Sequence, residues 1–336
     1  MTGTIRSNQI QKIFSQNEAY LSLIIVAYSI LVTSLNPSFL SFENLLDLGK
    51  SSASLGIMAI GVFVVLLSGG IDMSFTAIAI SGQYIAANVL IASGIDNIYF
   101  AFLISCMVGL GLGAINGLII SYFRIPTFIV TLGTLNVFHG ILLTVVGTKA
   151  VNSAQLPDCF KKFGATNVFT IVKPEGGSYG LSIFTVIFIA LALLTWFILT
   201  YTRLGRSVYA IGGDMEAAKR AGLNVFSIQF FIYCYVGILA GIAGVLHVSL
   251  IRYSNPTYLV GSELSVIAPV VLGGTRITGG SGTVIGTILG VAMITLLNNS
   301  LILIGLSSFW QEFFTGIIVA ISVSLSSYQI RKSMMI

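Results

Sequence analysis

The chain has 336 residues, of which 56% are hydrophobic and 8% are charged, with a net charge of +5 and a mean hydropathy of +0.98. A soluble domain usually carries about 25% charged residues because its surface faces water. The composition therefore excludes a soluble fold and disfavours a nucleic-acid-binding protein. It predicts an all-α integral membrane protein with a single transmembrane domain, residues 1–336.

Ten apolar stretches approach the roughly 20 residues that one bilayer crossing needs. The eighth is short, contains Pro269 and ends in glycines, so a broken or re-entrant helix is expected there. Ten spans are the best count, with nine or eleven as alternatives. In chain order the stretches are Ala19–Leu35, Ser51–Leu67, Phe75–Ala92, Ile98–Ser121, Ile125–Val146, Leu181–Tyr201, Phe226–Leu250, Tyr258–Leu272, Thr283–Ile304 and Phe309–Ser327.

The positive charges of the connecting loops predict the orientation. With the N-terminus inside, ten Lys and Arg residues lie on the inner side and six on the outer side, and four of those six fall in one long loop. Short loops dominate the positive-inside effect. With the four charges of the long loop left aside, ten positive charges lie inside and two lie outside. We expect both termini in the cytoplasm and an even number of spans.

Between the second and third stretches lies the segment SGGIDMS, residues 68–74. Two adjacent glycines break a helix, and its freed backbone groups then need partners from protein or water. An ionisable residue near membrane depth is costly and usually lines a cavity or holds broken backbone. Asp72 is therefore a candidate channel residue, while Asp72 or Ser74 as a simple helix cap is the alternative.

The long outer loop, about residues 147–180, contains Pro157, Pro174, Gly176 and Gly177. It is too small for an enzyme domain. A docking or gating role and a passive linker both stay open.

The inner loop, about residues 202–225, contains a short helix signal. Asp214 is placed to cap a helix over Met215–Ala221, and Gly222 is placed to end it. Glu216 in the first turn and Lys219 near the end suit the helix dipole. A short helix with a face of small residues suits docking into a groove of a soluble partner, although an ordinary surface helix carries the same signals.

The second half of the chain contains VLGGT, residues 271–275, which is similar to the LLSGG of residues 66–70. Repeats with broken helices are common in transporters, and the substrate path often runs between them. Chance similarity among glycine-rich spans is the alternative.

No enzyme site is evident. Cys106, Cys159 and Cys234 have unrelated spacings, and neither His139 nor His247 belongs to a catalytic or metal-binding set. The chain lacks a Walker-type phosphate loop, so it is not expected to hydrolyse ATP. Gly109, Gly111, Gly113 and Gly117 fit close helix packing instead.

Four segments together resemble the permease subunits of ribose-type sugar ABC importers, within the wider family that includes branched-chain amino acid permeases. They are SGGIDMS at 68–74, RIPTFIVTLGT at 124–134, GRSVYAIGG at 205–213 and VLGGT at 271–275, and the resemblance extends over about residues 45–323. Asp214 stands where relatives often carry Asn, and Met73 where many carry Leu.

The resemblance implies a type II importer fold in the bacterial inner membrane. Two permease copies or paralogues would form one channel, and a periplasmic or lipid-anchored sugar-binding protein would deliver substrate. A separate cytoplasmic ATPase would bind the ATP, so this chain needs no cofactor. The ATPase would dock on a coupling segment that includes Gly205, Arg206, Gly213, Asp214, Glu216, Ala217, Ala218, Ala221 and Gly222.

The expected channel residues are Ser68, Gly69, Gly70, Asp72, Ser74, Gly273 and Gly274. Polar candidates for the substrate path, each of which could instead make an interhelical hydrogen bond, are Gln83, Asn88, Asn116, Thr131, Thr134, Asn136 and Asn298. Ribose or a similar monosaccharide is the expected substrate. Autoinducer-2 or a nucleoside is the alternative, and an ion-coupled secondary transporter, with Asp72, Glu263 or Glu312 as the coupling carboxylate, is the less favoured class.

Overall fold

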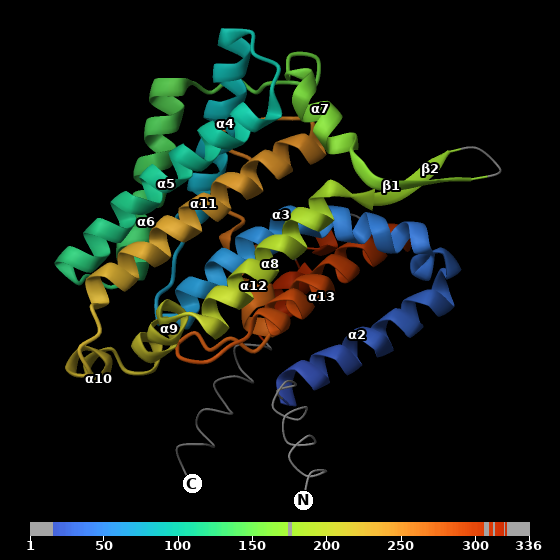
Figure 1. Ribbon diagram of the computed structural model, residues 1–336. Helices are drawn as coiled ribbons and strands as arrows, with labels where there is room; N and C mark the ends of the chain where they lie inside the picture. Colours follow the sequence, from blue (N-terminus) through green and yellow to red (C-terminus); the bar gives the residue numbers. More distant parts are fainter. Residues whose placement is uncertain (1–15, 174–176, 306–308, 312, 319, 321–336) are drawn as a thin grey trace, which may run out of the picture.

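A computed structural model describes residues 16–173, 177–305, 309–311, 313–318 and 320 of the chain (Figure 1). Nearly all of the described structure is helical, with one two-stranded antiparallel hairpin. The elements are α2 Gln16–Leu35, the 3-10 helix η1 Pro37–Leu40, α3 Phe42–Leu67, α4 Phe75–Ser93, α5 Ile98–Phe123, α6 Thr127–Ile141, the π-helical turn η2 Leu142–Val146, α7 Asp158–Ala165, β1 Asn167–Val172, β2 Ser178–Ser182, α8 Ile183–Tyr201, α9 Arg203–Gly213, α10 Met215–Arg220, α11 Val225–Ile251, α12 Glu263–Leu272 and α13 Val284–Leu303.

Eight helices in the described residues are long and apolar enough to cross a membrane, and they coincide with eight of the ten predicted stretches. The eighth stretch contains only the ten residues of α12. At 1.5 Å per residue α12 is about 15 Å long, roughly half the hydrocarbon core, as expected for a broken helix. The tenth stretch lies largely outside the described residues, so the total count stays a prediction.

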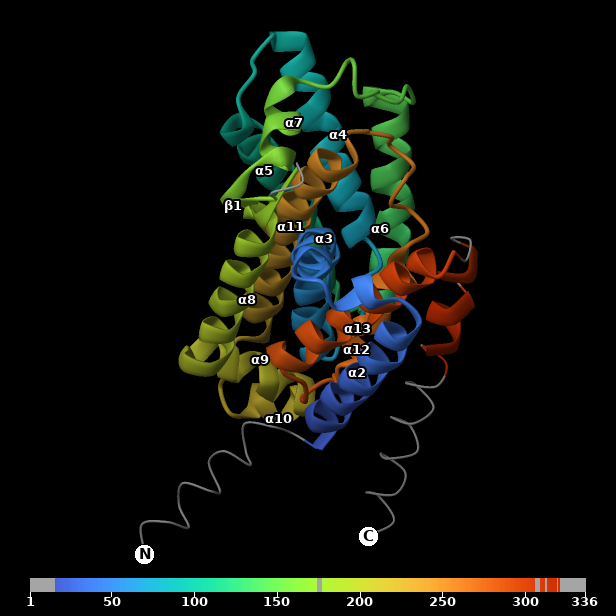
Figure 2. The same cartoon turned by 90° about the vertical axis from the view of Figure 1, so that its right-hand side faces the viewer.

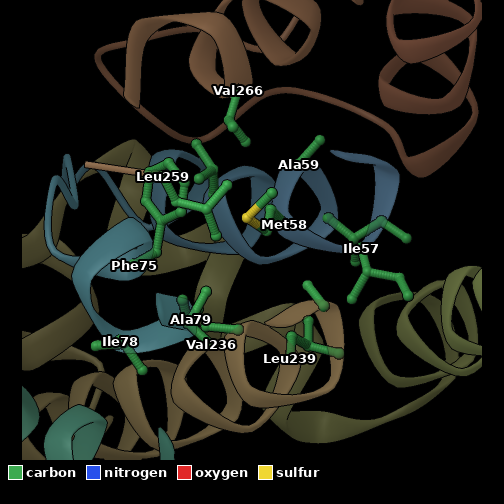
Figure 3. Packing of buried hydrophobic residues seen from close by; sticks show 14 of the residues in the cluster. Ile57, Met58, Ala59, Phe75, Ile78, Ala79, Val236, Leu239, Leu259 and Val266 are labelled. Carbon is green, nitrogen blue, oxygen red and sulfur yellow. The ribbon is translucent and has the colours of Figure 1, made fainter. Parts of the chain in front are cut away.

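Helix α3 forms the centre of the molecule (Figures 1 and 2). Its residues 56–67 are all buried, and it packs against α8, α11, α12 and α13. Figure 3 shows Ile57, Met58 and Ala59 of α3 among side chains from α4 and α11. A helix that is apolar on every side is stable only when other apolar groups surround it, and α3 is surrounded by neighbouring helices.

Glycines bring α5 and α11 into close contact, as the sequence predicted. A Cβ added at Gly109 would overlap the carbonyl oxygen of Gly237, and one added at Gly113 would overlap that of Tyr233. Gly111 is the exception, because a Cβ there would have nothing within 4 Å. Small residues let backbones approach closely in lipid, where dispersion contacts rather than hydrophobic force hold helices together.

The long loop at 147–180 is folded, with α7 anchored at one end of the molecule. The Cys159 amide donates to Asp96 Oδ1 at 2.6 Å, and Lys162 lies 3.8 Å from the same carboxylate. The hydrogen bond from Lys161 holds the pKa of Asp158 below its usual value, with the two groups 2.7 Å apart. Burial and Asp96 raise the pKa of the Cys159 thiol to about 12, so this thiol stays protonated at neutral pH.

The β1–β2 hairpin projects sideways from the body in Figure 1. Lys173, just after β1, pairs with Glu43 of α3 at 2.5 Å and lies over the Tyr179 ring. Upstream, Val151 pairs with Ser254 through two backbone hydrogen bonds. The loop is therefore attached to the spans at several points, although whether it docks a partner stays a prediction.

The α5–α11 contact predicts that Gly237→Ala will destabilise the protein. The new methyl group would overlap the Gly109 carbonyl, and overpacking of this kind costs about 1–3 kcal/mol. The thermal unfolding midpoint in detergent should fall clearly. Gly111→Ala is the matched control, because its methyl group meets open space and should leave the midpoint unchanged. Equal midpoints for the two variants would contradict the close contact.

Candidate functional site

The helix break at residues 68–74 begins with a glycine turn. After α3 ends, Gly69 adopts φ +82°, a conformation that only glycine takes readily. The Gly69 amide donates to the Leu66 carbonyl at 2.9 Å, and the Gly70 amide donates to the Val65 carbonyl at 3.1 Å. These two bonds satisfy the last carbonyls of α3 and end the helix cleanly.

Two threonines of α6 bind the extended segment that follows. The Ile71 amide donates to Thr127 Oγ1 at 2.8 Å, and the Met73 amide donates to Thr131 Oγ1 at 3.1 Å. Thr131 in turn donates to the Ile71 carbonyl at 3.2 Å. The segment thus receives the hydrogen bonds that interrupted backbone requires in a membrane. Sequence reasoning missed Thr127, although its i, i+4 spacing from Thr131 places both hydroxyls on one helix face.

A buried polar chain connects this segment to α5. Asn116 Nδ2 donates to Ser74 Oγ at 2.7 Å, and Ser74 Oγ donates to Asp72 Oδ1 at 2.6 Å. Asp72 is 1% exposed. Ser74 occupies the N-cap position of α4, but its side chain makes no capping bond, so Ser74 as a simple cap was wrong. Asp72 holds the broken backbone instead, accepting from the Ser74 amide at 2.7 Å.

The start of α12 meets the start of α4. Thr76 Oγ1 donates to Glu263 Oε1 at 2.5 Å, and the Gly261 amide donates to the same oxygen at 3.0 Å. The N-terminal end of α4 is therefore hydrogen-bonded to the N-terminal end of the short helix α12. Sequence reasoning considered Glu263 for ion coupling, but its partner Thr76 could be identified only in the folded structure.

Helix α12 ends in the same way as α3. Gly274 has φ +89°, and its amide donates to the Val271 carbonyl at 2.9 Å, while the Thr275 amide donates to Val270 at 3.3 Å. Gly273 packs on Gly286 of α13, with no space for a Cβ. Helix α10 ends with the same pattern at Gly222. The shared geometry of α3 and α12 is therefore explained equally well by an internal repeat and by a common type of helix end.

Three chain segments meet in a set of glycines that we call the glycine junction: Gly69, Gly212, Gly279 and Gly280. The Gly280 amide donates to the Leu67 carbonyl at 2.9 Å. A Cβ at Gly212 would overlap that carbonyl, and a Cβ at Gly279 would lie 2.6 Å from the Gly69 Cα. The junction therefore joins the end of α3, the end of α9 and the α12–α13 loop. Of these glycines, only Gly69 was among the predicted site residues.

Helix α9 leads into the junction and was not predicted. It buries Val208 and Ile211. Gly205 packs so closely on the end of α8 that a Cβ would overlap the Leu199 backbone, whereas Arg206 and Gly213 are exposed. Gly205 thus sets the angle between α8 and α9, which explains why a glycine occupies that position.

Helix α10 agrees with the predicted short helix to within one residue. Asp214 Oδ1 accepts from the Ala217 amide at 2.9 Å, and Gly222 ends the helix with φ +85°. Glu216, Ala217, Lys219 and Ala221 are exposed. Ala218 is 5% exposed and packs inward, so the expected small-residue face is narrower than predicted.

The predicted path residues make a variety of hydrogen bonds. Asn116 and Thr131 belong to the helix break, and Gln83 is buried with Oε1 3.2 Å from His247 Nδ1. Three others bond a carbonyl of their own helix, namely Asn88, Thr134 and Asn136. Asn298 accepts from Gln311 Nε2 through its backbone carbonyl at 3.2 Å. Most of these residues therefore contribute interhelical or local hydrogen bonds.

A cavity of about 570 Å³ lies next to α10, between the α5–α6 turn and the start of α11. Gly69 and Ile71 of the helix break line it, and so do Glu216 and Lys219 of α10. The helix break and the surface helix thus share one cavity.

Comparison with known proteins gives one consistent result. Residues 44–323 match the family described as "Branched-chain amino acid transport system / permease component". The ribose import permease protein RbsC of Bacillus subtilis is 37% identical, covering 88% of each chain. RbsC of Escherichia coli K12 is 33% identical, covering 87% of this chain and 88% of the relative. The autoinducer 2 import system permease protein LsrC of Yersinia enterocolitica is 31% identical, covering 92% and 82%. No solved structure matches the chain.

The helix break predicts that Thr131→Val will loosen the segment at residues 70–74. Valine keeps the shape of threonine but leaves the Met73 amide and the Ile71 carbonyl unpaired, at a cost of about 1–3 kcal/mol. Hydrogen exchange at the Met73 amide should become faster, and the unfolding midpoint should fall.

Thr144→Val is its control, because the Thr144 hydroxyl bonds only the Gly140 carbonyl of its own helix, at an exposed position. Unchanged exchange at Met73 in Thr131→Val would show that Thr131 does not hold the segment.

Proposed function

Because the chain belongs to the family of branched-chain amino acid transport system permease components, we propose that it is the transmembrane permease subunit of an ATP-binding cassette importer. Its substrate is a small sugar, with ribose favoured by the RbsC relatives. The protein is a multi-pass component of the bacterial inner membrane, which its eight long apolar helices support.

One observation carries the mechanism: through α9, the glycine junction connects the surface helix α10 to the end of α3 and to the loop after α12. Helix α10 follows α9 directly, and Gly212 in the last turn of α9 lies against Leu67 and Gly280. Motion applied at α10 therefore reaches the end of α3 and the loop after α12 through backbone contacts. Backbone without intervening side chains transmits displacement efficiently, because a close-packed contact has little space to absorb it.

The partners follow from this role. A cytoplasmic ATPase docks on α10 and binds the ATP, so the permease itself carries no nucleotide and is not an enzyme. The exposed Glu216 and Ala217, with Lys219 and Ala221, form the docking surface. A second permease copy or a paralogue completes the channel, and a sugar-binding protein delivers substrate at the end that carries α7 (Figure 2). Both termini lie in the cytoplasm.

A second candidate substrate is autoinducer-2, because LsrC is 31% identical over most of this chain. The two candidates share the same import mechanism and differ only in cargo. The binding protein that delivers the cargo contributes much of the selectivity between them.

The proposed function predicts ATP-dependent uptake in proteoliposomes that contain this chain, its ATPase and its binding protein. Labelled ribose should accumulate faster than other pentoses, hexoses and autoinducer-2. Uptake that continues without the ATPase and follows a proton or sodium gradient would contradict an ATP-driven importer.

The docking surface predicts that Glu216→Arg will abolish uptake. Reversing this exposed charge on α10 opposes a complementary group on the ATPase, so ATP hydrolysis stimulated by the binding protein should fall at least about tenfold. Asp158→Arg is the control for ATPase docking, because Asp158 is an exposed carboxylate on α7 at the opposite end of the molecule. Co-purification of the ATPase should fall with Glu216→Arg and stay unchanged with Asp158→Arg, and equal losses of ATPase binding would argue against docking at α10.

The glycine junction predicts that Gly212→Ala will separate ATP hydrolysis from transport. The methyl group would push α9 away from the Leu67 carbonyl, while the surface of α10 stays intact. The complex should assemble and hydrolyse ATP but import little sugar. Gly133→Ala on the exposed side of α6 meets nothing within 4 Å and should import normally. Normal uptake by Gly212→Ala would contradict the junction as the coupling route.

A further inference from the structure

We propose that the cavity beside α10 holds the headgroup of an anionic phospholipid. The cavity has a volume of about 570 Å³ and lies where α5 ends, α6 begins and α11 begins. Helix ends meet the headgroup region of a bilayer, because an apolar span stops where the hydrocarbon core stops. The cavity therefore lies at the depth of lipid headgroups, whichever membrane face it occupies.

The charges of the cavity favour an anion. Arg124 and Lys219 line it, both are exposed, and neither forms an ion pair with any described residue. Glu216 is the one carboxylate among the lining residues, so the lining has one excess positive charge. Basic pockets between transmembrane helices are a recognised way to bind charged headgroups.

A buried hydroxyl gives a second, independent indication. Ser121 lines the cavity and is 6% exposed, yet its Oγ has no hydrogen-bond partner in the described part of the chain. A buried polar atom without a partner is costly, and native structures usually supply one. A phosphate or glycerol oxygen in the cavity would accept the hydrogen bond that Ser121 can donate.

The apolar surroundings favour a lipid over a soluble phosphate. Ile125 and Phe128 at the start of α6, together with Phe226 of α11, line the cavity and remain 39–42% exposed. Next to them Tyr122 and Phe123 are 73% and 64% exposed, and aromatic side chains gather at membrane interfaces. Acyl chains attached to a bound headgroup would cover this surface, whereas inorganic phosphate would leave it exposed.

The site has a consequence for transport, because it joins α10 to the α5–α6 turn. An anionic lipid there would contact Lys219 on the ATPase-docking helix and Arg124 on the adjacent turn. It would also lie against Gly69 and Ile71 of the helix break. The lipid site goes beyond the import function and does not depend on which sugar is carried.

The test is native mass spectrometry of the purified full chain, titrated with phosphatidylglycerol or phosphatidylcholine. The wild type should bind one phosphatidylglycerol in clear preference to phosphatidylcholine. The Arg124→Gln/Lys219→Gln double variant should bind it at least about tenfold more weakly, since each basic group near an anionic headgroup contributes to affinity. Glu216→Gln should bind it more tightly, because that change removes the one carboxylate from the lining.

Arg203→Gln is the matched control, because Arg203 is an exposed arginine on the same end of the molecule that does not line the cavity. An equal loss in this control would show that general surface charge attracts the lipid, and the proposed site would be wrong. Equal binding of the two lipids would also overturn it. Displacement of phosphatidylglycerol by millimolar glycerol phosphate would assign the cavity to a soluble phosphate instead.

Discussion

The contact between Gly212 and the Leu67 carbonyl constrains the rest of the structure. No Cβ fits between them, and the Gly280 amide donates to the same carbonyl at 2.9 Å. This contact fixes the end of the central helix α3 against α9 and against the loop between α12 and α13. The helix break at 68–74, the short helix α12 and the surface helix α10 all take their positions from it.

The Asp72 and Ser74 side chains of the break are buried between helices, so their polar groups need partners within the protein. The threonines of α6 and the Asp72–Ser74–Asn116 chain meet most of this demand. A carboxylate used in this way is structural, since its hydrogen bonds hold the start of α4 in place. Gly69 and Gly70 end α3, and residues of α5 and α6 together with Asp72 keep the following segment ordered.

The cavity beside α10 adjoins both the helix break and the surface helix. Residues of the helix break and of the surface helix both line it, so a ligand that fills it contacts both. The surrounding bilayer would supply the lipid for such a site. The glycine junction connects α10, through α9, to the end of α3. A lipid in the cavity would be a second connection between α10 and the helix break.

The sequence by itself determined the local features. The apolar stretches placed eight spans to within a few residues, apart from an earlier start of α3, because burial in lipid depends on composition along each segment. Asp214 and Gly222 bounded α10, since a cap involves groups only three or four residues apart. Pro269 and the following glycines indicated the short α12. The motifs at residues 68–74, 124–134, 205–213 and 271–275 together indicated the family.

Only the tertiary structure decided which distant segments meet. Gly212 and Gly280 both contact Leu67, which is far from them in the sequence. No local sequence pattern predicts that contact. Helix α9 was missed because its three glycines lower helix propensity, while burial of Val208 and Ile211 against the body overrides that preference. Packing between helices also decides that Ala218 is buried and which residues bond to Glu263 and Gln83. A single sequence does not reveal that packing.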